Sequence, residues 1–290
     1  MSDPTTHTLD VPGATLRYDV REPDGDSGAP PLLLIASPMS AQGFGTLAGS
    51  FTDRTVVTYD PRGVARSERT DGAATATPEE HADDLHRVIA DLGADRVDVF
   101  ASSGGAVNAL VLVAQHPEQV RTLVAHEPPA AAVLPDREAA LAAVADLHAA
   151  YQAGGTGPGM AKFMALASHK GPVPAGFIAH APDSIPGFGP AEDDGRRDDP
   201  LLGQNLISST THEYDFDALR AAPARIVMAA GAHSEGQLAQ RAAAAIAARL
   251  GSEPVVFPGG HAGFLGGEFG QTGEPEAFAA RLREVLDEPA

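Results

Sequence analysis

The sequence lacks cysteine and tryptophan, is poor in basic residues and contains no long apolar run. Without cysteine the chain can form no disulfide, thiolate nucleophile, iron–sulfur cluster or cysteine-ligated zinc site. Its 20 basic and 39 acidic residues leave a net charge of -19, which argues against nucleic acid or an anionic membrane surface as a partner. No apolar run approaches the roughly 18 residues of a membrane-spanning helix, and the first ten residues, MSDPTTHTLD, do not resemble a signal peptide. We therefore expect a soluble, cytoplasmic protein that is a monomer or a homodimer.

The chain has enough apolar sequence to fold around a core. It has 290 residues, of which 43% are hydrophobic, so it is too apolar for a disordered chain and long enough for one large domain or two small ones. Short apolar runs alternate with amphipathic segments over the first 129 residues and again after residue 223. This alternation predicts an α/β fold with a doubly wound, mostly parallel sheet that carries helices on both faces. The expected strands are 14–20, 31–37, 54–60, 96–102, 120–129, 224–231 and 253–259, and the expected amphipathic or helical segments are 44–51, 77–93, 104–117, 236–251 and 275–286.

The alternation breaks between residues 130 and 222. Residues 136–167 are alanine-rich and helical in pattern, and residues 170–200 are dense in glycine, proline and aspartate. We expect a core of residues 1–129 and 223–290, interrupted by an inserted lid over the edge of the sheet where ligands bind in open α/β folds. The apolar residues of this lid are expected to roof a pocket and contact substrate; they include Met160, Phe163, Met164 and Phe188.

The most informative segment is VDVFASSGGAVNALVLV, in which a strand runs directly into a helix. A serine on such a sharp turn, with small residues two positions before and after it, is typical of a nucleophile elbow. Ser103 is the central residue here, Ala101 takes the position of the usual first glycine, and Gly105 holds the second. A simple glycine-rich turn is the alternative, whereas a dinucleotide-binding loop needs the pattern G-x-G-x-x-G, which this segment does not supply.

With this turn, the chain resembles the α/β-hydrolase fold family over nearly its whole length. The segment YDPRGVARSE resembles the D-x-R-G-x-G-x-S motif of that family, with Ala65 in place of a glycine. LLLIASPMS stands where the family carries His-Gly-x-Pro, and FPGGHAGFL stands where it carries its catalytic histidine. The resemblance implies a serine nucleophile, a histidine base and a carboxylate that orients the histidine.

The base is assigned to His261. A serine near neutral pH needs a base within hydrogen-bonding reach, and His261 lies in a loop after a late buried strand, flanked by small residues that leave room for its ring. Histidines on predicted helices, such as His81, are expected to be solvated.

Two carboxylates compete for the third role. The family usually carries its acid after the strand at 224–231, where Ser234 occupies the usual position and Glu235 follows one residue later. Some members, including a fungal zearalenone lactone hydrolase, carry the acid after the strand that follows the nucleophile helix, which is the position of Glu127 here. Because an acid at the end of an apolar strand is costly without a partner, we favour Glu127 and keep Glu235 as the alternative.

The oxyanion that forms when serine attacks a carbonyl needs amide donors. The amide of Gly104 is one. The second comes from the loop after residues 31–35. It is Ser37 or, if the alignment slides by two residues, Met39; we favour Ser37 and count Met39 among the substrate contacts.

These residues predict a serine hydrolase that cleaves a small, apolar carboxylic ester or lactone through an acyl-enzyme on Ser103. Haloalkane dehalogenases and epoxide hydrolases of this fold use an aspartate nucleophile, so Ser103 argues against both. No metal site emerges from the spacing of histidines and acids, and no cofactor is expected. Two alternatives stay open: a receptor-like protein that binds a ligand without turnover, and a carbon–carbon bond hydrolase or perhydrolase that uses the same three residues.

Overall fold

The computed structural model describes residues 3–25, 28–185 and 192–288. A nine-stranded sheet forms its centre, with the strand order β1-β2-β4-β3-β6-β7-β8-β9 and with β5 paired to β2. Along this order, β4, β3, β6, β7, β8 and β9 pair in parallel, whereas β2 pairs antiparallel with β1, β4 and β5. The strands are β1 (Thr5–Val11), β2 (Ala14–Arg21), β3 (Leu32–Ser37), β4 (Val56–Asp60), β5 (Glu68–Arg69), β6 (Val97–Ser103), β7 (Val120–His126), β8 (Arg225–Gly231) and β9 (Val255–Phe257).

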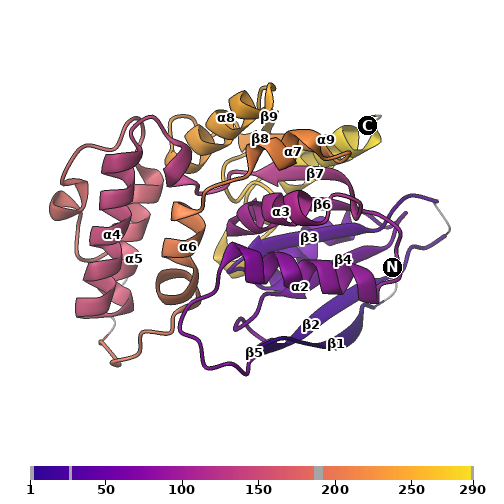
Figure 1. Ribbon diagram of the computed structural model, residues 1–290, viewed down its shortest axis with the longest axis horizontal. Coiled ribbons are helices and arrows are strands. Elements are labelled where there is room, and N and C mark those ends of the chain that lie inside the picture. Colours follow the sequence, from indigo (N-terminus) through magenta and orange to yellow (C-terminus); the bar gives the residue numbers. More distant parts are fainter. Residues whose placement is uncertain (1–2, 26–27, 186–191, 289–290) are drawn as a thin grey trace.

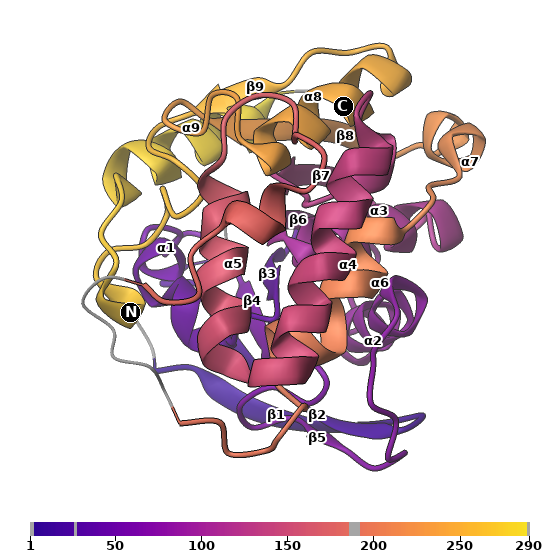
Figure 2. The same ribbon diagram turned by 90° about the vertical axis from the view of Figure 1, so that its left-hand side faces the viewer.

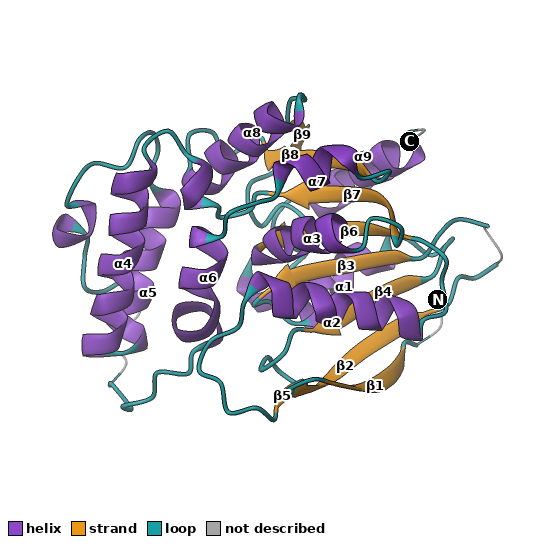
Figure 3. Ribbon diagram, viewed as in Figure 1, coloured by secondary structure: helices purple, strands orange, loops and turns teal. Residues whose placement is uncertain are grey.

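Helices cover both faces of this sheet (Figures 1 and 3). One apolar cluster joins the sheet to α2, α3 and α8, and a second joins it to α1 and α9. The predicted fold class, a doubly wound and mostly parallel sheet, is confirmed. The helices are α1 (Gly45–Gly49), α2 (Pro78–Asp91), α3 (Gly104–Gln115), α4 (Arg137–Gly154), α5 (Thr156–Ser168), α6 (Leu206–Thr211), α7 (Phe216–Ala221), α8 (Leu238–Leu250) and α9 (Pro275–Asp287), with short turns η1 (Ala41–Phe44), η2 (Ala131–Val133), η3 (Phe177–His180), η4 (Pro200–Asn205) and η5 (Glu268–Gly270).

The segment between β7 and β8 contains α4, α5 and α6, which stand beyond one end of the strands. In Figure 2, which is turned so that this end faces the viewer, α4 and α5 lie across the strands. The parallel strands point towards these helices in Figure 3, so the inserted helices face the carboxyl ends of the strands. The last helix of the segment, α7, instead contacts α3 and α8 beside the sheet. No helix in the described part of the chain is long and apolar enough to cross a bilayer.

The D-x-R-G motif holds together the loops that follow β4. The Asp60 carboxylate accepts hydrogen bonds from the Ala41 amide at 2.8 Å and from Nε of Arg66 at 2.6 Å. Arg62 is buried and donates two hydrogen bonds of 2.7 Å to both oxygens of the buried Asp84 on α2. Because Asp60 fixes the turn just after β3 and Arg62 fixes α2, this motif ties α2 and the end of β4 to the loop that follows Ser37.

We predict that Arg62→Met lowers the free energy of unfolding by about 3 to 5 kcal/mol, because it leaves the Asp84 carboxylate buried without its cation. Urea unfolding at neutral pH measures this change. The control is Arg87→Met, which removes a helix-surface pair with Asp83 that is more than a third exposed on both sides and should cost less than about 1 kcal/mol. Equal losses in the two variants would contradict the role given to the buried pair.

Candidate active site

Ser103 occupies a strained turn between β6 and α3. Its backbone has φ 56° and ψ −130°, a conformation that non-glycine residues rarely adopt. The packing around the turn explains why small residues follow it: a Cβ on Gly104 would lie 2.7 Å from the Ser37 carbonyl oxygen, and one on Gly105 would lie 2.6 Å from Cα of Ala36. Glycine therefore lets the start of α3 approach β3, and this contact holds Ser103 in its strained conformation.

The two adjacent serines have different surroundings. Ser103 is half-buried and lines a cavity. Ser102 is buried, and its hydroxyl lies 3.1 Å from Nδ1 of His126 on the neighbouring strand. Only Ser103 of this pair is positioned to meet a ligand in the cavity.

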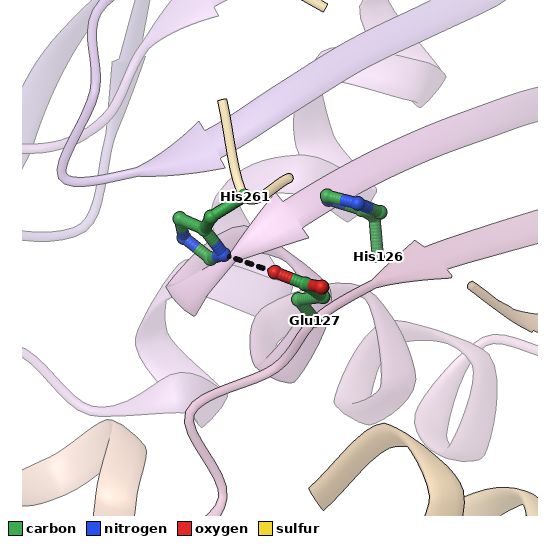
Figure 4. Close-up of side chains that lie close together, drawn as sticks. All are labelled: His126, Glu127 and His261. Carbon is green, nitrogen blue, oxygen red and sulfur yellow. Dashed lines mark hydrogen bonds and ion pairs between the residues drawn. The ribbon is translucent and has the colours of Figure 1, made fainter. Parts of the chain in front are cut away.

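His261 and Glu127 come from loops far apart in the sequence and form a hydrogen bond at the carboxyl end of the sheet (Figure 4). Nδ1 of His261 lies 2.7 Å from Oε2 of Glu127, and the other carboxylate oxygen accepts a 2.8 Å hydrogen bond from the Gly231 amide. Glu127 is buried, whereas the His261 side chain is 45% exposed and lines the same cavity as Ser103. The bond to Glu127 leaves the opposite ring nitrogen, Nε2, available for proton exchange with a group in the cavity.

The environment of Glu127 favours its charged form. Burial by itself raises the pKa of this carboxyl group, but the hydrogen bond from His261, the neighbouring His126 and the Gly231 amide together lower the pKa to about 2. Glu127 is thus ionised throughout the neutral range and able to hold a proton on Nδ1 of His261.

His126 is a neighbour of this pair that the sequence analysis did not single out. Its buried ring lies 6.0 Å from that of His261, and it packs against Phe100, Phe257, Phe264 and Phe278. Burial lowers the pKa of His126 to about 4, so the ring is neutral at pH 7. The sequence held one indication that His126 lies near the site: it directly precedes Glu127 at the end of a buried strand.

Among the described residues, one cluster has the residue types of a metal site: His126, Glu127 and His261. Their potential ligand atoms lie within 4.8 Å of one another. The carboxylate already accepts hydrogen bonds from His261 and Gly231, and Nδ1 of His126 contacts Ser102. A metal on the carboxylate would have to displace the bonds from His261 and Gly231, whereas Nε2 of His126 has no partner among the described residues. The cluster as built is a hydrogen-bonded network.

The cavity beside Ser103 has a volume of about 380 Å³, and its wall is mostly apolar. Of the predicted contacts, Phe163 and Met164 belong to the wall, together with Ser37 and Gly104 of the predicted oxyanion hole. The whole wall consists of Ser37, Pro38, Ser103, Gly104, Pro129, Val144, Phe163, Met164, Leu166, Ala167, Ser168, Leu201, Asn205, Leu206, Ser209, Thr210, Gln237, Leu238, Ala239, His261, Ala262 and Gln271.

Other predicted contacts lie elsewhere. Met39 packs against the apolar cluster on the α1 and α9 side of the sheet, and Met160 packs against the cluster that joins the sheet to α2, α3 and α8. Neither lines the cavity. Phe188 lies outside the described residues.

Glu235 is exposed, and the carboxylate hydrogen-bonded to His261 is that of Glu127. His81, expected on a solvated helix face, is instead buried, because it packs against the inserted segment and lies within hydrogen-bonding distance of Asn205.

The family model described as "alpha/beta hydrolase fold" matches residues 43–181. The hydrolase YraK of Bacillus subtilis (strain 168), described as uncharacterized, is 31% identical over 297 aligned residues, which cover 97% of this chain and 95% of YraK. The chain belongs to the α/β-hydrolase fold family. Hydrolysis is the reaction class that these matches support.

Solved structures agree on the fold. The crystal structure of proline iminopeptidase from Mycobacterium smegmatis covers 97% of each chain with a TM-score of 0.64 and 20% identity, a likeness that shows the fold alone. A Vigna radiata epoxide hydrolase mutant matches over 44% of this chain and 39% of its own, with 22% identity and a TM-score of 0.39, so this match carries no weight for the reaction.

We predict that lowering the pH destabilises the protein partly through His126. Between the pKa of about 6.5 for an unfolded histidine and about 4 for His126 in the fold, the unfolded chain binds a proton that the native chain does not. Stability is therefore lost as the pH falls through this window. The free energy of unfolding of His126→Phe, relative to the wild type, should rise by about 3 kcal/mol between pH 7 and pH 4.

Urea unfolding at several pH values measures this difference. Phenylalanine suits a site already surrounded by four phenylalanines. Ser102→Ala, which keeps His126 and removes only the hydroxyl beside its Nδ1, should retain the loss of stability at low pH. Parallel curves for His126→Phe and the wild type would show that His126 is not the buried neutral group described.

Proposed function

We propose that this hydrolase is a serine hydrolase that cleaves a carboxylic ester or a lactone through an acyl-enzyme on Ser103. The observation that carries the proposal is the 2.7 Å bond between His261 and Glu127 beside a serine held at positive φ in the wall of the same cavity. These are the parts that serine-dependent acyl transfer requires: a nucleophile, a base and a carboxylate that orients the base.

The proposed reaction proceeds in two halves. Ser103 attacks the substrate carbonyl while Nε2 of His261 accepts the hydroxyl proton, and Glu127 stabilises the imidazolium that results. The amides of Gly104 and Ser37 donate to the oxyanion, and the N-terminus of α3, which begins at Gly104, adds a favourable dipole. His261 then protonates the leaving alcohol, and water activated by the same histidine hydrolyses the acyl-enzyme.

The proposed substrate is apolar and of moderate size. Leucine, valine, phenylalanine, methionine and proline side chains make up much of the cavity wall, and the volume of about 380 Å³ suits a small ester or lactone. We propose that the inserted residues 130–222 act as the lid of this cavity, since Phe163 and Met164 on α5 and Leu206 near the start of α6 contribute to its wall.

We predict that Ser103→Ala lowers kcat for p-nitrophenyl esters by at least about 10⁴-fold, because the nucleophile is lost while the fold is kept. The matched control is Ser102→Ala, one residue earlier, whose hydroxyl contacts His126 and not the cavity. Labelling by a serine-directed fluorophosphonate should vanish in the first variant and persist in the second. A wild-type protein that neither labels nor turns over esters would favour the receptor-like alternative.

We predict that Glu127→Gln lowers kcat by about 10³- to 10⁴-fold, because the glutamine amide would present an N–H to Nδ1 of His261 and favour the wrong tautomer. Glu235→Gln should change kcat by less than about twofold, since Glu235 is exposed. Steady-state kinetics on one p-nitrophenyl ester compare the two variants. The reverse order of losses would assign the acid to Glu235.

A further inference from the structure

Asn205 is a buried polar residue in the wall of the cavity, on a part of the inserted segment that is tied to the core. It ends the π-helical turn η4, which begins with Asp199 accepting hydrogen bonds from the Leu201 and Leu202 amides. The Ala76 amide, in the loop before α2, donates to the Gln204 carbonyl at 3.0 Å. Asn205 is therefore presented to the cavity by a fixed backbone.

The side-chain amide of Asn205 is held in one orientation. Its Nδ2 donates to the Pro200 carbonyl at 2.7 Å, and its Oδ1 lies 2.8 Å from Nε2 of His81. A carbonyl oxygen accepts only, so the atom facing Pro200 must be the nitrogen. Oδ1 then faces His81, whose Nε2 must carry the proton that completes the second bond.

His81 acts as a neutral anchor behind Asn205. The ring is buried, it does not line the cavity, and its Nδ1 has no hydrogen-bonding partner among the described residues. Burial lowers the pKa of His81 to about 4, so the ring is uncharged at neutral pH. An unprotonated Nδ1 without a donor beside it is consistent with the tautomer in which Nε2 carries the proton.

One hydrogen of the Asn205 amide remains without a partner among the described residues. An amide NH₂ group has two donors, and the bond to Pro200 uses one of them. Three hydroxyl groups in the same wall, those of Ser168, Ser209 and Thr210, already donate to backbone carbonyls.

We infer that Asn205 is a specificity-determining residue: its free N–H donates a hydrogen bond to an acceptor oxygen of the substrate, remote from the bond that is cleaved. This inference rests on the proposed function and narrows its substrate class to esters or lactones that carry a second oxygen, such as a ketone, in an otherwise apolar chain. A simple alkyl chain would cover the donor and leave it unsatisfied, which a site built to form a hydrogen bond penalises.

The test compares methyl octanoate with its 5-, 6- and 7-oxo derivatives. Calorimetry on Ser103→Ala measures the dissociation constant of each ester without turnover. The ratio of the dissociation constant of the parent ester to that of the best oxo ester should fall roughly tenfold when Asn205→Leu is added. Each variant binds both esters in the same experiment, so a general loss of folding or affinity cancels in the ratio.

Three further variants sharpen the comparison. The double variant Asn205→Leu/His81→Leu replaces both partners of the buried bond, so no unpaired His81 remains. It should show the same fall in the ratio as Asn205→Leu. His81→Leu alone should lower the ratio by roughly threefold, because it removes the anchor and not the donor. Thr211→Ala, on the same helix α6 but exposed and outside the cavity wall, should leave the ratio unchanged, since its hydroxyl donates to the Ile207 carbonyl.

The inference is overturned if the ratio is the same with and without Asn205 for all three ketones, or if none of the four esters binds. Turnover is judged separately on the protein with Ser103 intact. Ester hydrolysis no faster than that of Ser103→Ala would contradict the proposed function, while the ratio of dissociation constants would still decide the role of Asn205.

Discussion

The buried Glu127 carboxylate is the constraint on which the site depends. Its oxygens bind the Gly231 amide at the end of β8 and the ring of His261 after β9, while its own amide donates to the Ala229 carbonyl. An isolated carboxylate in this position would be expensive to bury, and these bonds offset the cost. Since the same bonds join the ends of three successive strands, β7, β8 and β9, the residue proposed to orient His261 also holds together the sheet edge on which it acts.

A second constraint fixes the side of the cavity that carries Ser103. Parallel pairing aligns Ser37 with Ser103 at the ends of β3 and β6, and the two glycines after Ser103 let α3 approach β3 closely. The loop after Ser37 is held in turn by Asp60, which binds the Ala41 amide. The D-x-R-G motif therefore acts outside the cavity, because it holds the loop that follows Ser37, the proposed oxyanion donor.

Much of the fold was predictable because its signals are local. Continuous apolar runs predicted the buried parallel strands, and the threonine cap of α2 marked its start, where Thr77 accepts from the Glu80 amide. The predictions from local sequence patterns were wrong where a contact with a distant part of the chain decides the conformation. The strand predicted to reach residue 129 ends at His126, since Glu127 turns to φ 48° to reach its partners. β1 was missed because it is a polar edge strand, and α6, with the sequence LISSTT, because its hydroxyls satisfy helix carbonyls instead of competing with them.

The site shows the same division between local and distant information. The turn around Ser103 depends on five consecutive residues, 101–105, so the sequence alone indicated it. The orientation of the Asn205 amide instead depends on His81, more than a hundred residues earlier. His81 follows the pattern of a surface helix, and it is buried only because the inserted segment folds back over α2. That burial fixes the Asn205 amide, which keeps one N–H without a partner among the described residues. Much of the cavity wall around Asn205 is apolar. Because a site built to form a hydrogen bond rejects a ligand that cannot form it, we expect substrate choice in this hydrolase to depend more on that amide than on the apolar side chains around it.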